Sequence, residues 1–138
     1  MTGDIDWRGA KAPGRDVIEQ LARTAWDQMP HDIRTRCGAL SIHVGEFAAQ
    51  DILSELEVTN PYDLMGLYHG IQLQSGNPQD GKDPDKVYLF RRPILDYWVE
   101  KQSSLGTIVA QVLIREIGHH FGFSESQIEG LEAQAATS

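Results

Sequence analysis

The sequence predicts a single α+β domain, and three observations lead to this prediction. The chain has 138 residues, a length that suits one sizeable hydrophobic core. Residues 108–114 are apolar nearly all round, as expected for part of a central buried helix. Three short segments, residues 39–44, 67–73 and 87–91, are predicted to be β-strands. No internal repeat and no second domain is indicated.

The N-terminal half is predicted to contain a helix, a strand and a second helix. In residues 16–29 apolar side chains recur at helical spacing, and Pro30 ends that helix. Residues 39–44 alternate between apolar and polar side chains, which is typical of a half-buried strand. Residues 48–56 are predicted to form a short helix whose inward side includes Leu56.

The middle of the chain is predicted to hold two strands joined by a long loop. Asn60 precedes a proline and is expected to cap a short helical turn. Residues 67–73 form the second predicted strand, with Gly70 as a bend or bulge. Residues 74–86 are rich in glycine and proline and connect to the third strand at residues 87–91. This loop could be a lid over a cleft or an ordinary connection.

The C-terminal part is predicted to hold two helices with clear boundary signals. Either Ser103 or Ser104 is placed to cap the central helix. Gly122 is placed to end that helix in a left-handed conformation. Ser124 and Gln127 have the spacing of a capping box at the start of a last helix.

Composition and charge exclude several classes of protein. The formal net charge is −8, which argues against nucleic acid or an anionic membrane as a partner. Cys37 is the only cysteine, so no intrachain disulfide can form and a reducing compartment fits. Neither a signal peptide nor a membrane-spanning apolar run is evident, and we expect a cytoplasmic protein. Residues 1–14 are predicted to be a flexible leader and residues 15–138 the folded domain.

Residues 115–125 carry the most informative pattern. They are similar to the zinc-peptidase motif H-E-x-x-H-x-x-G-x-x-D, with Arg115 in place of the first histidine and Glu125 in place of the aspartate. Helix positions 115 and 119 lie on one face, which is why the motif spaces its two histidine ligands by four. Glu116 lies one step round the helix, where the motif has its general base. Gly122 lets the chain reverse and return residue 125 as a third ligand.

Arg115 conflicts with a zinc site at this position. A zinc peptidase needs three protein ligands and one open position for water, and a guanidinium has no lone pair to offer. Arg115 is instead expected to fill the site by pairing with Glu125 or Glu116. If Arg115 swings out, a weak site formed by His119, Glu125 and Glu116 stays open as the alternative. We therefore expect zinc binding to be weak or absent.

Other polar side chains are candidates for accessory roles. His120 is expected to face away from the metal side of the helix, as a packed or supporting histidine. His43 and His69 lie on predicted strands and could reach the site. Tyr68 or Tyr97 could donate a hydrogen bond to a developing oxyanion. For each of these strand and tyrosine side chains, ordinary packing or solvent exposure is the competing interpretation.

Three sequence blocks together resemble a known family. The blocks are N-P-Y-D-L-M-G-L-Y at residues 60–68, F-R-R-P-I-L-D-Y-W at residues 90–98 and E-I-G-H-H-F-G at residues 116–122. The chain resembles the small zincin-like metallopeptidases of bacteria, sometimes called minimal metalloproteases, from about residue 18 to residue 131.

The resemblance implies a zincin-like α+β fold, with a small mixed sheet of about three or four strands packed on helices and a buried active-site helix. It also implies a divalent-metal site and peptidase activity on unspecified peptides. Carried over by position, His119 would be a zinc ligand, Glu116 the catalytic base and Glu125 the third ligand. Arg115 stands where the family has its first zinc ligand.

Two functions compete at this point. The first is a zinc-dependent peptidase that is intact in its lineage and impaired here by Arg115. The second is a non-catalytic pseudo-enzyme that binds a peptide or protein, with edge addition along residues 87–91 as one way to do so. Both take a peptide or protein as partner, and neither predicts an oligomeric state.

Overall fold

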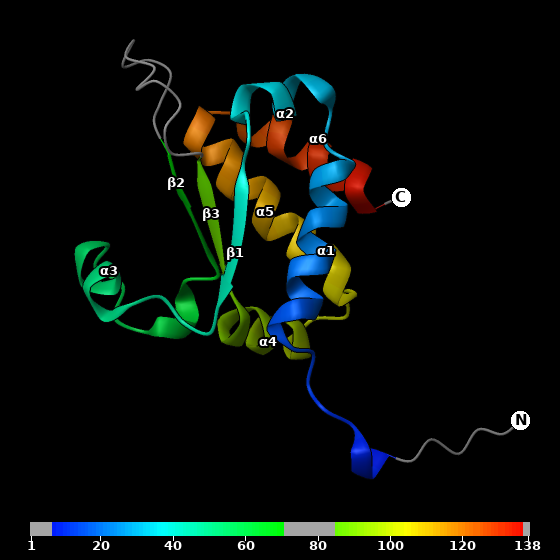
Figure 1. The fold of residues 1–138 in the computed structure, drawn as a ribbon, viewed down its shortest axis with the longest axis vertical. Helices are drawn as coiled ribbons and strands as arrows, with labels where there is room; N and C mark the ends of the chain where they lie inside the picture. Colours follow the sequence, from blue (N-terminus) through cyan, green and yellow to red (C-terminus); the bar gives the residue numbers. More distant parts are fainter. Residues whose placement is uncertain (1–6, 71–84, 137–138) are drawn as a thin grey trace, which may run out of the picture.

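The structure, a computed structural model, describes residues 7–70 and 85–136. In chain order its elements are η1 (Trp7–Gly9), α1 (Arg15–Asp27), α2 (His31–Cys37), β1 (Ser41–Gly45), α3 (Gln50–Glu55), η2 (Pro61–Asp63), β2 (Gly66–His69), β3 (Lys86–Phe90), α4 (Arg91–Glu100), α5 (Leu105–Phe121) and α6 (Glu125–Ala136). This mixture of helices with a small sheet confirms the predicted α+β class (Figure 1).

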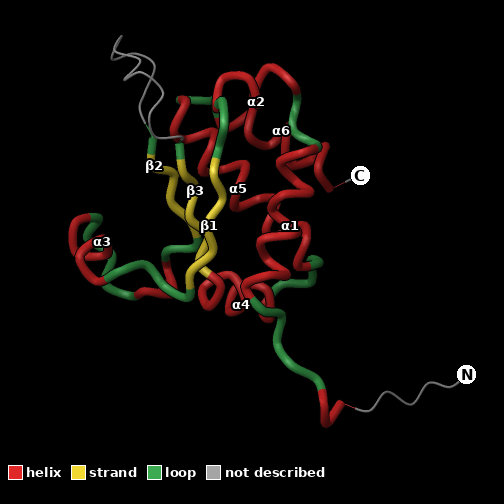
Figure 2. The backbone as a smooth tube through the Cα atoms, in the orientation of Figure 1, coloured by secondary structure: helices red, strands yellow, loops and turns green. Residues whose placement is uncertain are grey.

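The described strands form a three-stranded mixed sheet in the order β1-β3-β2 (Figure 2). β1 runs parallel to β3, and β2 runs antiparallel to it. The central strand is therefore β3, whose two sides are both paired. Edge addition along residues 87–91 was wrong for this reason, because the open edges in the described part of the sheet belong to β1 and β2.

The two faces of the sheet have different surroundings. Ile42, Val87 and Leu89 point to one face and join a core built around α5 and α1. α5 supplies most of this core, since eight of its residues are buried. α3 lies on the other side of the sheet, away from α5 (Figure 1). It packs there with Phe90 in a smaller apolar cluster.

Sequence signals at the ends of the C-terminal helices are confirmed. The Ser104 side chain accepts a hydrogen bond from the Thr107 amide at the start of α5. Gly122 ends α5 with φ of 74°, in the left-handed region that favours glycine. At the start of α6, Ser124 and Gln127 exchange reciprocal hydrogen bonds of 2.8 and 3.1 Å as a capping box.

The N-terminal half contains a helix that the sequence analysis missed. α2 begins directly after Pro30, which is at the N-cap of this second helix as well as at the end of the first. Ile33 and Cys37, four residues apart, are its buried side. The prediction for Leu56 was wrong, because α3 ends at Glu55 and the Leu56 side chain is 45% exposed.

Some predictions cannot be compared with the structure. Residues 71–84 lie outside the described residues. They include the end of the strand predicted at residues 67–73, beyond β2, and most of the loop predicted at residues 74–86. The flexible leader stays a prediction, although the Pro13 carbonyl accepts a 2.7 Å hydrogen bond from Arg91. In the described part of the chain, no helix combines the length and the apolar character that crossing a bilayer requires.

Candidate functional site

The candidate site lies where the last turns of α5 meet α6. Gly118 allows the two helices to come close, since a Cβ there would lie 2.7 Å from Cγ1 of the buried Ile128. Gly122 reverses the chain between the helices. This joint places the first and second turns of α6 beside Arg115.

Arg115 is surrounded by two carboxylates of α6. Its Nη2 donates to Glu125 Oε2 at 2.9 Å, and its Nε and Nη2 donate to the two oxygens of Glu132 at 2.8 and 3.3 Å. The hydrogen bond with Glu125 is the largest cause of a raised Arg115 pKa, with Glu132 adding to it. The Glu132 side chain is only 13% exposed, against 56% for Glu125. Arg115 thus closes the α5–α6 joint with a bidentate pair and a single hydrogen bond.

The sequence analysis named Glu125 as a partner of Arg115 but missed Glu132. Glu125 and Glu132 are seven residues apart, which is close to two helical turns and puts them on one face of α6. That spacing was the available signal. It becomes decisive only once α6 is known to pack beside Arg115.

Glu116 points in another direction, toward the sheet. A Cβ on Gly66 of β2 would lie 3.1 Å from Glu116 Cγ and 2.8 Å from Val112 Cγ1, so the strand passes directly over this part of α5. Burial raises the pKa of the Glu116 carboxyl to about 7, and a hydrogen bond with the backbone of Tyr68 partly offsets the rise. The expected alternative pair between Arg115 and Glu116 does not form among the described contacts, because Arg115 turns to α6.

His119 and Glu125 complete the set of residues that the resemblance assigned to zinc. His119 is exposed in the last turn of α5, and one carboxylate oxygen of Glu125 accepts a hydrogen bond from Arg115. In the described residues, no three histidine, cysteine, aspartate or glutamate side chains are grouped so as to hold a metal ion. With Arg115 hydrogen-bonded to Glu125 and without a lone pair of its own, positions 115, 119 and 125 are not arranged as three zinc ligands in this structure.

The accessory candidates are distributed over different surfaces. His120 stacks on Tyr68 with ring centroids 4.0 Å apart, burial lowers its pKa, and its buried Nε2 has no hydrogen-bond partner among the described residues. The Tyr68 hydroxyl donates to Asp85 at 2.7 Å. Tyr97 is 37% exposed on α4, under the Lys101 ammonium.

His69 and His43 lie on the face of the sheet opposite α5. Side chains alternate along a strand, so His69 points away from the face that carries Tyr68. Both histidines line a groove between the outer face of the sheet and the α3 region. The structure therefore brings neither of them to Glu116.

The fold and this joint define an α+β protein whose central helix carries Glu116 and His119 and whose next helix returns an acidic residue beside it. A comparison with protein families matches residues 37–135 to the zincin-like metallopeptidases. The match covers most of the chain, and the protein belongs to this family. A comparison with individually curated proteins found no match.

Proposed function

We propose that this protein descends from zinc-dependent peptide hydrolases and that Arg115 has impaired its metal site. The observation that carries the proposal is the 2.9 Å contact between the Arg115 guanidinium and Glu125, the residue at the third-ligand position. Arg115 stands at the position of the first expected ligand, and its guanidinium is bonded to Glu125, the expected third ligand. Two of the three protein donors that a zinc peptidase requires are thereby withdrawn.

Electrostatics supports the same conclusion. A unit positive charge about 4 Å from a divalent cation costs on the order of several kcal/mol at an effective dielectric near 20. Arg115 is already hydrogen-bonded to one oxygen of Glu125 and to both oxygens of Glu132, so a metal bound by Glu125 would share this carboxylate with the guanidinium. Peptide hydrolysis dependent on zinc is therefore expected to be weak or absent in the protein as it stands.

The test is the metal content of the protein and of Arg115→His, both purified without chelator and without a histidine tag. Inductively coupled plasma mass spectrometry should find near-stoichiometric zinc only in Arg115→His. Arg23→His is the matched control, because it adds a histidine at an exposed position of α1 and should bind none. Stoichiometric zinc in the unaltered protein would refute the impairment, and no zinc in Arg115→His would refute the ancestral zinc site.

A second candidate function is metal-independent binding of a peptide or protein. The observation that favours it is the pair of open edges that β1 and β2 present in the described sheet, since an extended peptide can add to such an edge. Binding should then survive addition of EDTA. Peptide turnover that a chelator abolishes in the unaltered protein would exclude this candidate.

The setting of either function is also part of the proposal. A cytoplasmic location is supported by the single cysteine, Cys37, which is buried and free. The net charge of −8 favours a polypeptide over nucleic acid or an anionic membrane as partner.

A further inference from the structure

The outer face of the sheet carries a groove that the metallopeptidase site does not use. Its volume is about 520 Å³, which lies within the range of small-molecule sites. Its lining residues are His43, Val44, Gly45, Phe47, Ala48, Ala49, Ile52, Leu67, His69, Tyr88 and Phe90. All three strands and the segment leading into α3 contribute, so the groove is built from rigid elements as well as a loop.

The floor of the groove is apolar and aromatic. Tyr88 and Phe90 come from the central strand β3, with Leu67 beside them on β2. Phe47 also lines the groove and is 36% exposed, with its ring against Tyr62 and the Arg92 guanidinium. An apolar or aromatic group could therefore bury surface here without displacing any part of the core.

The rim of the groove carries basic side chains. His43 on β1 stacks on Tyr88 with ring centroids 5.4 Å apart, and His69 lies across the sheet on β2. Lys86 is the register partner of His69 and, by alternation along β3, lies on the same face as Tyr88. The two imidazoles line the groove, and Lys86, which is not among the lining residues, is next to His69 on the same face of the sheet.

Among its described lining residues the groove has no acidic side chain, although the chain as a whole has a net charge of −8. The acids adjacent to it in sequence are engaged elsewhere. Asp85 accepts a hydrogen bond from Tyr68 on the opposite face of the sheet, and Glu46 accepts one from Arg91 at 2.8 Å. The groove is therefore complementary to an anion attached to an apolar body.

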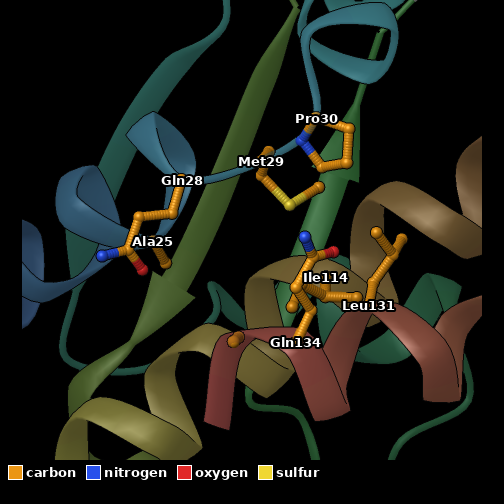
Figure 3. A pocket seen from close by; sticks show the side chains of 8 residues that line it. Ala25, Gln28, Met29, Pro30, Ile114, Leu131 and Gln134 are labelled. Atoms are coloured by element: carbon orange, nitrogen blue, oxygen red, sulfur yellow. The ribbon is translucent and has the colours of Figure 1, made fainter. Parts of the chain in front are cut away.

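A smaller pocket elsewhere provides a contrast. It has a volume of about 330 Å³ and lies between the end of α1 and α6, where Gln28, Ile114 and Leu131 are among its lining residues (Figure 3). None of the described residues that line it is charged. It has space for an apolar group but lacks a basic rim.

We propose that the groove on the outer face of the sheet binds a small apolar carboxylate. The apolar part lies on Tyr88 and Phe90, and the carboxylate accepts hydrogen bonds from His69 and Lys86 at the rim. Charge-assisted hydrogen bonds of this kind are stronger than neutral ones. The groove should therefore bind a carboxylate more tightly than an uncharged molecule with the same apolar part. The proposal does not depend on the metal site, which lies on the opposite face of the sheet.

The first experiment compares 4-phenylbutyrate with 4-phenylbutan-1-ol, which has the same apolar part but no charge. Both are titrated into the isotope-labelled full-length protein and followed by amide chemical shifts. The acid should bind at least about fivefold more tightly than the alcohol, with shifts concentrated in β1, β2, β3 and residues 46–52. Equal affinity for acid and alcohol, or no binding of the acid at millimolar concentration, would overturn the proposal.

Substitutions at the rim then identify the groups responsible. Lys86→Gln and His69→Gln should each lower the affinity for the acid by roughly threefold to tenfold and leave the affinity for the alcohol unchanged. Lys101→Gln is the matched control, since it removes the same charge from the end of α4 and should change neither affinity. An equal loss in Lys101→Gln would mean that net charge, and not the groove, attracts the acid, and would refute the site.

A longer occupant is tested separately. An apolar peptide with a free C-terminal carboxylate is compared with its C-terminal amide and with 4-phenylbutyrate. Competition between 4-phenylbutyrate and the free peptide supports a carboxylate site. Binding of both peptides without any binding of 4-phenylbutyrate would mean that the groove takes a polypeptide, and the proposal would be wrong.

Discussion

Two neighbouring residues of α5, Arg115 and Glu116, have opposite electrostatic surroundings. Arg115 faces α6 and meets two carboxylates within 3.3 Å. Glu116 faces β2, where burial raises its pKa to about 7 and the hydrogen bond from the Tyr68 backbone offsets only part of the rise. Consecutive helix positions point about 100° apart, so two opposite charges adjacent in sequence can have entirely different neighbours.

The comparison separates two sides of α5 in this zincin-like protein. On the α6 side, a salt-bridged cluster takes the place where the family resemblance puts a metal ligand. On the β2 side, Glu116 retains a half-buried position and a raised pKa, as a general base often has. Glu116 therefore keeps surroundings that suit the role the resemblance implies for it, whatever Arg115 does on the other side of the helix.

The largest expected change in stability concerns the side of α5 that faces β2, where a substitution removes the Glu116 charge. Glu116→Gln keeps the shape of the side chain and an oxygen for the Tyr68 amide. Because the folded-state pKa is raised from 4.5 to about 7, the native state holds a proton that the unfolded state releases, and stability is lost as pH rises through this window. At pH 8, Glu116→Gln should be more stable than the unaltered protein by up to about 3 kcal/mol.

Urea unfolding at pH 4 and at pH 8 measures this difference. It should be near zero at pH 4, where the carboxyl is protonated in both states, and should grow between pH 4.5 and pH 7. Glu129→Gln, at an exposed position of α6, is the control and should change stability little at either pH. A stability difference for Glu116→Gln that does not vary with pH would contradict the raised pKa.

The next effect tests the joint that brings α6 to Arg115. Gly118→Ala places a methyl group against Ile128 and should destabilise the protein by about 1–2 kcal/mol, because overpacking outweighs the gain in helix propensity. Gly130→Ala is the matched control, since nothing lies within 4 Å of the added methyl and up to about 1 kcal/mol of stabilisation is expected. Thermal unfolding followed by circular dichroism distinguishes the two, and a stabilising Gly118→Ala would contradict the close approach of the helices.

The smallest effect tests the ion pair itself. A double-mutant cycle of Arg115→Gln and Glu132→Gln should give a coupling energy of about 0.5–1 kcal/mol, because the Arg115 side chain is 39% exposed and water screens the pair. The coupling, measured by urea unfolding, should decrease at high salt. Coupling that is zero at low salt would mean that the contact seen in the structure does not stabilise the joint.

Much of the architecture followed from the sequence because it depends on local signals. The central helix, its serine cap, Gly122 and the capping box of α6 are all encoded within a few residues of where they act. α2 was missed because Pro30 was interpreted only as the end of α1, when it also lies at the start of the next helix. Leu56 was misplaced because helical periodicity does not show where a short helix stops.

The candidate site could be predicted only in part, because the sequence shows local signals but not which distant segments pack together. The spacing of Arg115, Glu116, His119 and Glu125 predicted the candidate residues, and the chemistry of a guanidinium predicted a conflict with zinc. Glu132 was not identified, because it becomes a partner only through the packing of α6 at Gly118. The role of β3 as central strand likewise depends on pairing between segments that are far apart in the chain.

The sequence by itself therefore determined the α+β class, the helix ends, the family resemblance and the presence of an arginine where that resemblance puts a first zinc ligand. These features depend on side-chain chemistry and on interactions within one or two helical turns. The tertiary structure alone decided that Arg115 is neutralised by Glu125 and Glu132, that Glu116 is buried against β2, and that His43 and His69 face a groove on the far side of the sheet. Each of these depends on which distant surfaces pack together, and that is set by burial of the whole core.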